Sequence, residues 1–330
     1  KYFSYEINGL RGLAVIFVFL FHINQEKFYL GYIGVDIFFV ISGYVISKLI
    51  YDKYKHDKFI ITDFYLNRFQ RLYPALILFV FFGIILVLLL NISGNYTDFI
   101  NTGFSSLFGI SNFYLNSIEN NYFNPLDLNP FIHTWSLSIE FQFYVLYPFF
   151  LIYCLKIFKN ENIIFFIISL TILSIIILSN FFNLKSFYHT PARIWEPLIG
   201  SLAFFIKSNN KNFNNQFIVK ILQIFFITIL FLNLSISLNI LTSTLLSFLI
   251  ILQTEKNLFF NKILCTKIFQ FFGNISYSIY LWHFLVIYFA ETYFINIEYY
   301  FFSCVLTLII SSFSYFIIER PLRKSNKIKK

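Results

Sequence analysis

The chain has 330 residues, of which 58% are hydrophobic and only 12% are charged, with 25 Lys and Arg against 16 Asp and Glu. A soluble domain carries about 25% charged residues and cannot bury this much apolar surface, so the composition excludes soluble globular, disordered and disulfide-scaffold proteins. A mean hydropathy of +0.70 and apolar segments near twenty residues long predict an all-α, polytopic integral membrane protein.

Apolar segments of membrane-spanning length predict about ten transmembrane helices, in a single transmembrane domain that covers residues 1–330. In chain order, the expected spans are 6–25, 31–51, 72–91, 134–155, 162–180, 193–207, 216–232, 235–253, 271–290 and 299–319.

The distribution of positive charge predicts how these helices are oriented. When the N-terminus is placed in the cytoplasm, 22 of the 25 Lys and Arg residues fall on the inner side, and only Lys27, Lys185 and Arg193 lie outside. This is the bias of the positive-inside rule, and it places both termini in the cytoplasm. A further span at 98–116 would reverse every later loop, so we interpret that segment as an outer, re-entrant or surface-lying piece.

The first two helices carry ionisable residues, each of which costs about 2.5–3.5 kcal/mol to insert. Arg11 and His22 lie within about 20° of each other on one helix face and roughly 16 Å apart along the axis. Asp36, on the second helix, is expected at the depth of His22, where a contact would orient the imidazole as a general base. The alternatives are a snorkelling Arg11, a structural hydrogen bond for His22 and a structural salt bridge for Asp36.

Three further ionisable residues are expected in the same layer of the outer half of the membrane. Glu140 lies one to two turns inside its helix, Glu196 near the outer end of the short sixth span, and His283 about two turns from the outer end of the ninth. Because they share a depth with His22 and Asp36, we predict that the five side chains line one polar cavity.

On the cytoplasmic side, Arg68 and Arg71 open the third span in a chain where Arg is scarce and Lys is abundant. The planar guanidinium group makes bidentate contacts to phosphate, whereas Lys offers a point charge. Together with Arg11, the pair predicts a phosphate-binding site at the inner face. The alternative is that both are ordinary anchors of the helix at the membrane surface.

Several other classes of site are disfavoured. The sequence has no P-loop, no HExxH and no cluster with the spacing of metal ligands, so we predict no metal and no permanently bound cofactor. Ser42 and Ser136 lack the GxSxG context of a serine nucleophile. The basic residues are scattered over membrane loops, where they attract anionic lipid, so nucleic-acid binding is not expected.

Five motifs occur in a fixed order along the chain. They are Arg11-x10-His22 with the following Gly34-Val-Asp36-Ile-Phe-Phe-Val-Ile-Ser42-Gly43, Arg68-x-x-Arg71, Trp135-Ser-Leu-x-x-Glu140-x-Gln-Phe-Tyr, Ser276-Tyr-Ser-Ile-Tyr-Leu-Trp-His283, and Glu319-Arg-Pro-Leu-Arg323. In these motifs the chain resembles the acyltransferase-3 family, membrane O-acyltransferases that modify bacterial surface glycans. The resemblance covers essentially the whole chain.

The resemblance implies a multi-pass enzyme of the bacterial cytoplasmic membrane that takes an acyl group, usually acetyl, from cytoplasmic acyl-coenzyme A. The acceptor would be a hydroxyl of a lipopolysaccharide O-antigen, another surface polysaccharide or a lipid-linked sugar. Arg68, Arg71 and Arg11 would hold the coenzyme A phosphates, and His22 would be the general base, oriented by Asp36 or another carboxylate.

The acceptor side of the reaction is assigned on the same resemblance. Glu140 is expected to be either a second orienting carboxylate or a sugar ligand, and Trp135, Ser136, Glu196 and His283 are expected to bind the acceptor. A transporter or flippase for lipid-linked sugars is the alternative from another class, because polar residues would also line its path. Internal repeats would favour a transporter, and we detect none.

Overall fold

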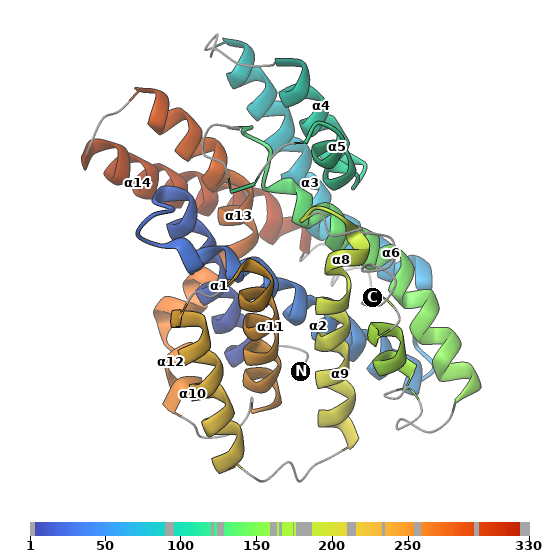
Figure 1. Cartoon of the computed structure of the whole chain (residues 1–330). Coiled ribbons are helices and arrows are strands. Elements are labelled where there is room, and N and C mark those ends of the chain that lie inside the picture. The colour runs from blue at the N-terminus through green and yellow to red at the C-terminus, as the bar shows by residue number, and fades with distance from the viewer. Residues whose placement is uncertain are drawn as a thin grey trace. The chain divides into compact units, whose positions relative to one another are not determined.

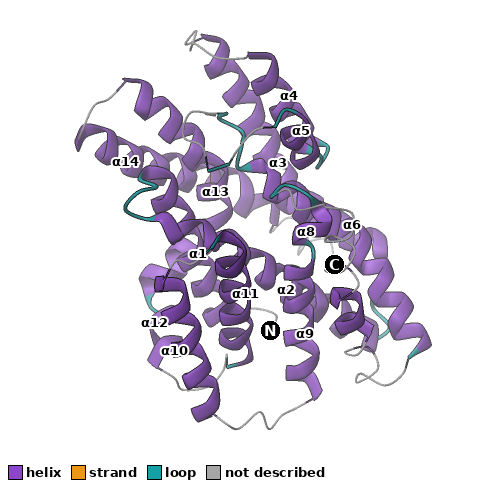
Figure 2. Cartoon of the chain, in the orientation of Figure 1, coloured by secondary structure: helices purple, strands orange, loops and turns teal. Residues whose placement is uncertain are grey.

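The computed structural model describes the residues given at the end of this paragraph. Every regular element among them is a helix, and no strand occurs in this part of the chain (Figure 2). The all-α prediction is therefore confirmed. The described residues are 4–89, 96–119, 122–123, 129–158, 164, 167–173, 175, 187–209, 216–232, 235–253, 259–293 and 297–323.

The helices follow the predicted spans closely, except where noted below, and the span predicted at 162–180 falls largely outside the described residues. In chain order (Figure 1) they are α1 (Tyr5–Ile23), η1 (Tyr29–Ile33), α2 (Gly34–Lys55), α3 (Ile61–Leu89), α4 (Tyr96–Leu107), α5 (Ser111–Ser117), α6 (Thr134–Ile157), α8 (Thr190–Arg193), α9 (Trp195–Asn209), α10 (Gln216–Leu232), α11 (Ile236–Leu252), α12 (Phe259–Leu264), α13 (Lys267–Tyr293), α14 (Ile297–Ser314) and the π-helical turn η2 (Tyr315–Glu319).

Helix α3 corrects the predicted start of the third span. The helix begins at Ile61 rather than at residue 72, so Arg68 and Arg71 lie within it and not at its first turn. Hydropathy identifies only the apolar part of a helix, whereas the hydrogen bonds of the helix backbone are internal and continue through a polar flank. The two arginines are therefore held on a rigid element.

The segment at 98–116 is not one continuous helix. It forms α4, with 12 residues, and α5, with seven, and the two are separated by a turn at Gly109, whose φ is +69°. Glycine adopts this left-handed conformation without the penalty that a side chain would bring. Neither helix approaches the roughly 20 residues that cross a bilayer, which agrees with the prediction that this segment does not span.

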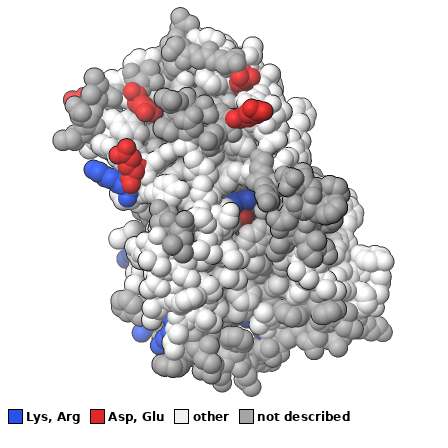
Figure 3. Space-filling view, viewed as in Figure 1, with Lys and Arg blue, Asp and Glu red and all other residues white. Residues whose placement is uncertain are grey.

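Five segments of the described residues are helical, long and apolar enough to cross a membrane: Tyr5–Ile23, Tyr29–Lys55, Ile61–Leu89, Thr134–Ile157 and Glu298–Arg323. On the face shown in the space-filling view, the charged side chains of the described residues form small separate patches among uncharged ones (Figure 3). These features are those of a multi-pass membrane protein. The count of ten spans and the cytoplasmic position of both termini stay predictions.

The chain divides into two compact units. The first contains Lys1–Phe59 and Phe143–Asn274, and the second contains Ile60–Gln142 and Ile275–Lys330. In the first unit, α2 packs along α9 at backbone contact. A Cβ atom on Gly43 would lie 1.7 Å from the carbonyl oxygen of Pro197, so only glycine fits there. This close approach brings the polar residues of α2 next to those at the start of α9.

The second unit has an aromatic and aliphatic core between α3, α6 and α13. Its fully buried members include Phe79 on α3, Phe131 just before α6 and Leu281 on α13. Phe79 contacts the rings of both Phe131 and Trp282 edge-on, with ring centroids 5.5 Å apart in each case. This core fixes the side chains that α6 and α13 present to each other.

Candidate active site

His22 lies in the last turn of α1 and is only 8% exposed. Its Nδ1 atom is 2.9 Å from the carbonyl oxygen of Val18. Because a carbonyl only accepts, Nδ1 carries the hydrogen, and a neutral imidazole then presents the lone pair of Nε2. The backbone of α1 itself therefore sets the tautomer that a general base requires.

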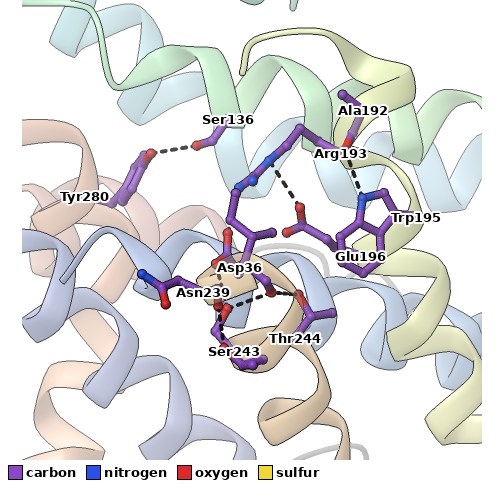
Figure 4. A network of polar contacts seen from close by, with 12 residues as sticks. Asp36, Ser136, Ala192, Arg193, Trp195, Glu196, Asn239, Ser243, Thr244 and Tyr280 are labelled. Atoms are coloured by element: carbon purple, nitrogen blue, oxygen red, sulfur yellow. Dashed lines mark hydrogen bonds and ion pairs between the residues drawn. The ribbon is translucent and has the colours of Figure 1, made fainter. Parts of the chain in front are cut away.

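Asp36 contacts Arg193 and Ser243 rather than His22 in this structure. Asp36, in the first turn of α2, is fully buried, and both of its carboxylate oxygens have other partners (Figure 4). Arg193 donates to Oδ1 at 2.6 Å, and the hydroxyl of Ser243 donates to Oδ2 at 2.7 Å. The sequence-based prediction assigned Arg193 only to the outer side of the membrane. A buried guanidinium group is charged, so it needs a carboxylate partner more than a neutral imidazole group does.

Arg193 joins two carboxylates that the sequence placed in one layer. Its Nε atom lies 3.1 Å from Oε1 of Glu196, one turn further along, and all three side chains are at most 3% exposed. The rings of Phe187 and Phe39 lie 4.9 and 5.8 Å from the guanidinium. Two carboxylates and two aromatic rings thus surround one cation, and Asp36 and Glu196 are brought together through it.

Helix α11 supplies the hydroxyl and amide groups of this network. Ser243 donates to Asp36, and the side-chain amide of Asn239, one turn earlier, donates to the hydroxyl of Tyr32 at 3.1 Å. The buried polar network therefore connects η1, α2, α8, α9 and α11 (Figure 4). Sequence reasoning missed Asn239 and Ser243, although their spacing of four residues in an apolar helix was a usable signal.

In the second unit, Ser136 and His283 are brought together through Tyr280. The hydroxyls of Ser136 and Tyr280 are 2.6 Å apart (Figure 4), and Tyr280 also donates to the carbonyl oxygen of His133 at 2.9 Å. The ring of His133, which sequence reasoning did not assign, lies 5.1 Å from that of His283. Trp135 is fully buried beside this group.

Both histidines are fully buried, and each has one ring nitrogen against the backbone. Nδ1 of His283 faces the carbonyl oxygens of Tyr280 and Ile279 at 2.8 and 3.0 Å, and Nε2 of His133 faces that of Leu281 at 3.0 Å. Each therefore donates at one nitrogen and keeps a lone pair at the other. The pair provides acceptors for hydroxyl or amide hydrogens.

Of the two arginines of α3, Arg71 lies near Tyr277 of α13. Arg68 stacks over the ring of Phe64 at 5.7 Å, and Leu72, the residue after Arg71, accepts a hydrogen bond of 2.8 Å from the hydroxyl of Tyr277. Both Arg71 and Glu140 lie close enough to Tyr277 to act on its hydroxyl electrostatically. Arg11 is half-buried on α1, in the first unit.

The predicted site residues are thus distributed over both units. Asp36 and Glu196 meet in the first, which also holds His22, while Glu140 and His283 belong to the second. That all five share one cavity stays a prediction. Within the described part of the chain, no group of three or more His, Cys, Asp or Glu side chains is arranged to hold a metal ion.

A family model and several curated proteins match this chain. A family model described as an acyltransferase domain matches residues 4–316. The O-acetyltransferase OatA of Staphylococcus aureus strain NCTC 8325 is 31% identical over 344 aligned positions, which cover 96% of this chain and 57% of OatA. The putative O-acetyltransferase SACOL0978 of strain COL matches with the same identity and coverage. The chain therefore spans little more than half the length of these relatives. No solved structure matches it.

Proposed function

Because the chain belongs to the acyltransferase-3 family, we propose that it transfers an acetyl group from cytoplasmic acetyl-coenzyme A to a hydroxyl of a bacterial surface glycan or lipid-linked sugar. The observation that carries this proposal is the state of His22, a buried imidazole whose Nδ1 is fixed by the carbonyl oxygen of Val18. The O-acetyltransferase names of the relatives support the acetyl group and an oxygen acceptor.

The reaction follows from the lone pair on Nε2 of His22. This atom accepts the proton of the acceptor hydroxyl while the hydroxyl oxygen attacks the thioester carbon. A carbon–oxygen bond forms, the carbon–sulfur bond breaks, and the coenzyme A thiolate leaves. The imidazolium then returns its proton to the thiolate, which regenerates the base.

The donor is proposed to bind from the cytoplasmic side. Arg68, Arg71 and Arg11 would contact its phosphates, because guanidinium groups make bidentate hydrogen bonds to them. Arg11 and His22 are separated by eleven residues of α1, or roughly 16 Å. An extended pantetheine arm running along this helix would carry the thioester from the phosphate site toward His22.

The acceptor is proposed to reach His22 from the outer side. Trp135, Ser136 and His283 keep their proposed role in holding it, and His133 joins them as a further hydrogen-bond acceptor. Glu140 is proposed as a sugar ligand or as a second orienting carboxylate. Asp36 pairs with Arg193, which connects the helices of the first unit, and its role in orienting His22 stays a proposal. The fully buried Glu196 also pairs with Arg193, and its predicted contact with the acceptor stays a proposal.

Transfer is tested directly with the purified chain in liposomes. Acetyl-coenzyme A labelled in the acetyl group is supplied on one side, together with candidate surface glycans and lipid-linked sugars. We expect label in an alkali-sensitive ester on the glycan. Movement of an unmodified lipid-linked sugar across the bilayer, with no label transferred, would instead support the transporter or flippase.

A further inference from the structure

Two neighbouring residues of α13 connect two charged segments of the second unit. The hydroxyl of Tyr277 donates to the carbonyl oxygen of Leu72, directly after Arg71 on α3. The hydroxyl of Ser278 donates to the carboxylate of Glu319 in η2. Because residues 277 and 278 are consecutive, these bonds place the turn of α3 that carries Arg71 beside the end of η2.

Glu319 in turn fixes the position of Arg323. Nη2 of Arg323 lies 2.6 Å from Oε2 of Glu319, one helical turn away, and the guanidinium also lies 5.8 Å from the ring of Tyr315. Glu319 is 1% exposed, whereas 29% of the Arg323 side chain is exposed. A buried carboxylate thus holds an arginine whose side chain is still partly exposed.

Two guanidinium groups lie near each other at this place. Arg71 lies close enough to Arg323 for the two like charges to repel each other, and Glu319, the carboxylate that pairs with Arg323, is also bonded to Ser278. Arg71 forms no ion pair with any carboxylate of the described residues. Glu140 also lies near Tyr277.

The two guanidinium groups also have unused hydrogen-bond donors. The Nε atoms of Arg71 and Arg323 are buried and have no hydrogen-bond partner. Leaving a buried donor of a charged group unsatisfied is costly, so such groups in native structures usually have an unseen partner. Two adjacent cations with unsatisfied donors call for an anion with several acceptor oxygens, and a phosphate group has this chemistry.

We propose that Arg323 is a further phosphate-binding residue of the donor site, which it forms together with Arg71, and that Glu319 holds it in position. The anion is a phosphate or diphosphate group at the cytoplasmic end of the second unit. The identity of the donor, acetyl-coenzyme A, rests on the proposed function. The site itself rests on Arg71, Arg323 and the contacts that hold them.

The test measures ligand binding rather than turnover. The purified full chain in detergent is titrated calorimetrically with coenzyme A and with inorganic pyrophosphate. The variants are Arg323→Gln, Arg323→Lys and the matched control Arg320→Gln, which removes the same charge from an exposed neighbouring arginine. Arg323→Gln should weaken both ligands by about tenfold or more, Arg323→Lys by less, and Arg320→Gln by less than about twofold. Thermal unfolding without ligand reports whether each variant is folded.

The outcomes separate this proposal from the proposed function. Equal affinities for Arg323→Gln and Arg320→Gln would overturn the role of Arg323 while leaving acetyl transfer intact. If Arg323→Gln does not fold, the test depends on Arg323→Lys. A folded Arg323→Lys variant that binds both ligands with wild-type affinity would also overturn the role of Arg323. If pyrophosphate binding depends on Arg323 but the wild type transfers no acetyl group, the anion site stands and the proposed function fails. A wild type that binds neither ligand contradicts both.

Discussion

The two units differ in the number of carboxylates that surround their arginine side chains and in how far those side chains are buried. In the first, Arg193 has two carboxylates, Asp36 and Glu196, and is at most 3% exposed. In the second, Arg71 and Arg323 lie near each other, Glu319 is the carboxylate paired with Arg323, and 29% of the Arg323 side chain is exposed. A fully buried cation held by two carboxylates stabilises the fold, whereas two neighbouring cations, one of them partly exposed, can also bind a ligand.

The largest effect that would sharpen this comparison is expected for Arg193→Gln. The change leaves the carboxylates of Asp36 and Glu196 buried without a cation. Removing one partner of a buried ion pair lowers the free energy of unfolding by about 3–5 kcal/mol. The measurement is unfolding by sodium dodecyl sulfate in mixed micelles. The control is Lys27→Gln, which removes one positive charge from an exposed side chain. An Arg193→Gln protein as stable as that control would show that the network is dispensable.

The hydroxyl partner of Asp36 gives the next largest effect. Ser243→Ala removes a hydrogen bond to a buried carboxylate, for which we expect a loss of about 1.5–3 kcal/mol in the same unfolding assay. Ser247, one turn further along α11, donates only to the backbone carbonyl of Ser243, so Ser247→Ala is the matched control with a smaller loss. Equal losses in the two variants would contradict the special role of the Asp36 contact.

Conservative substitutions of the two arginines on α3 test whether arginines of the second unit bind a ligand. Arg68→Lys and Arg71→Lys keep the charge but lose the planar fork, and each should weaken donor binding by about 1–2 kcal/mol. The measurement is a donor titration at saturating acceptor, and the exposed Lys58 provides a control in Lys58→Arg. If donor affinity is unchanged in both variants, these arginines are only anchors at the membrane surface.

The smallest effect is expected for Glu196→Gln. The first unit has two carboxylates for one cation, so neutralising Glu196 leaves Arg193 balanced by Asp36 at 2.6 Å. We expect a change in stability of less than about 1 kcal/mol, well below that of Arg193→Gln. A loss as large as that of Arg193→Gln would mean that both carboxylates are needed as anions.

The comparison also shows what the sequence could and could not predict. Apolar length located α1, α6 and α11 to within two residues, because the bilayer imposes that length on a helix. The start of α3 was missed because hydropathy does not report where helical hydrogen bonding begins. The partner of Asp36 was missed because Arg193 lies 157 residues away, and only tertiary packing of α2 against α9 brings them together.

The central claim, that Nε2 of His22 is the general base of an acetyl transfer, is tested most directly by single-turnover kinetics. Preloaded labelled acetyl-coenzyme A is mixed with the acceptor glycan for the wild type, His22→Ala and the control His56→Ala, which changes an exposed histidine. We predict a rate of transfer about 10²–10⁴ lower for His22→Ala, with donor binding and folding retained, and an unchanged rate for His56→Ala. Wild-type transfer by a folded His22→Ala protein would contradict the account.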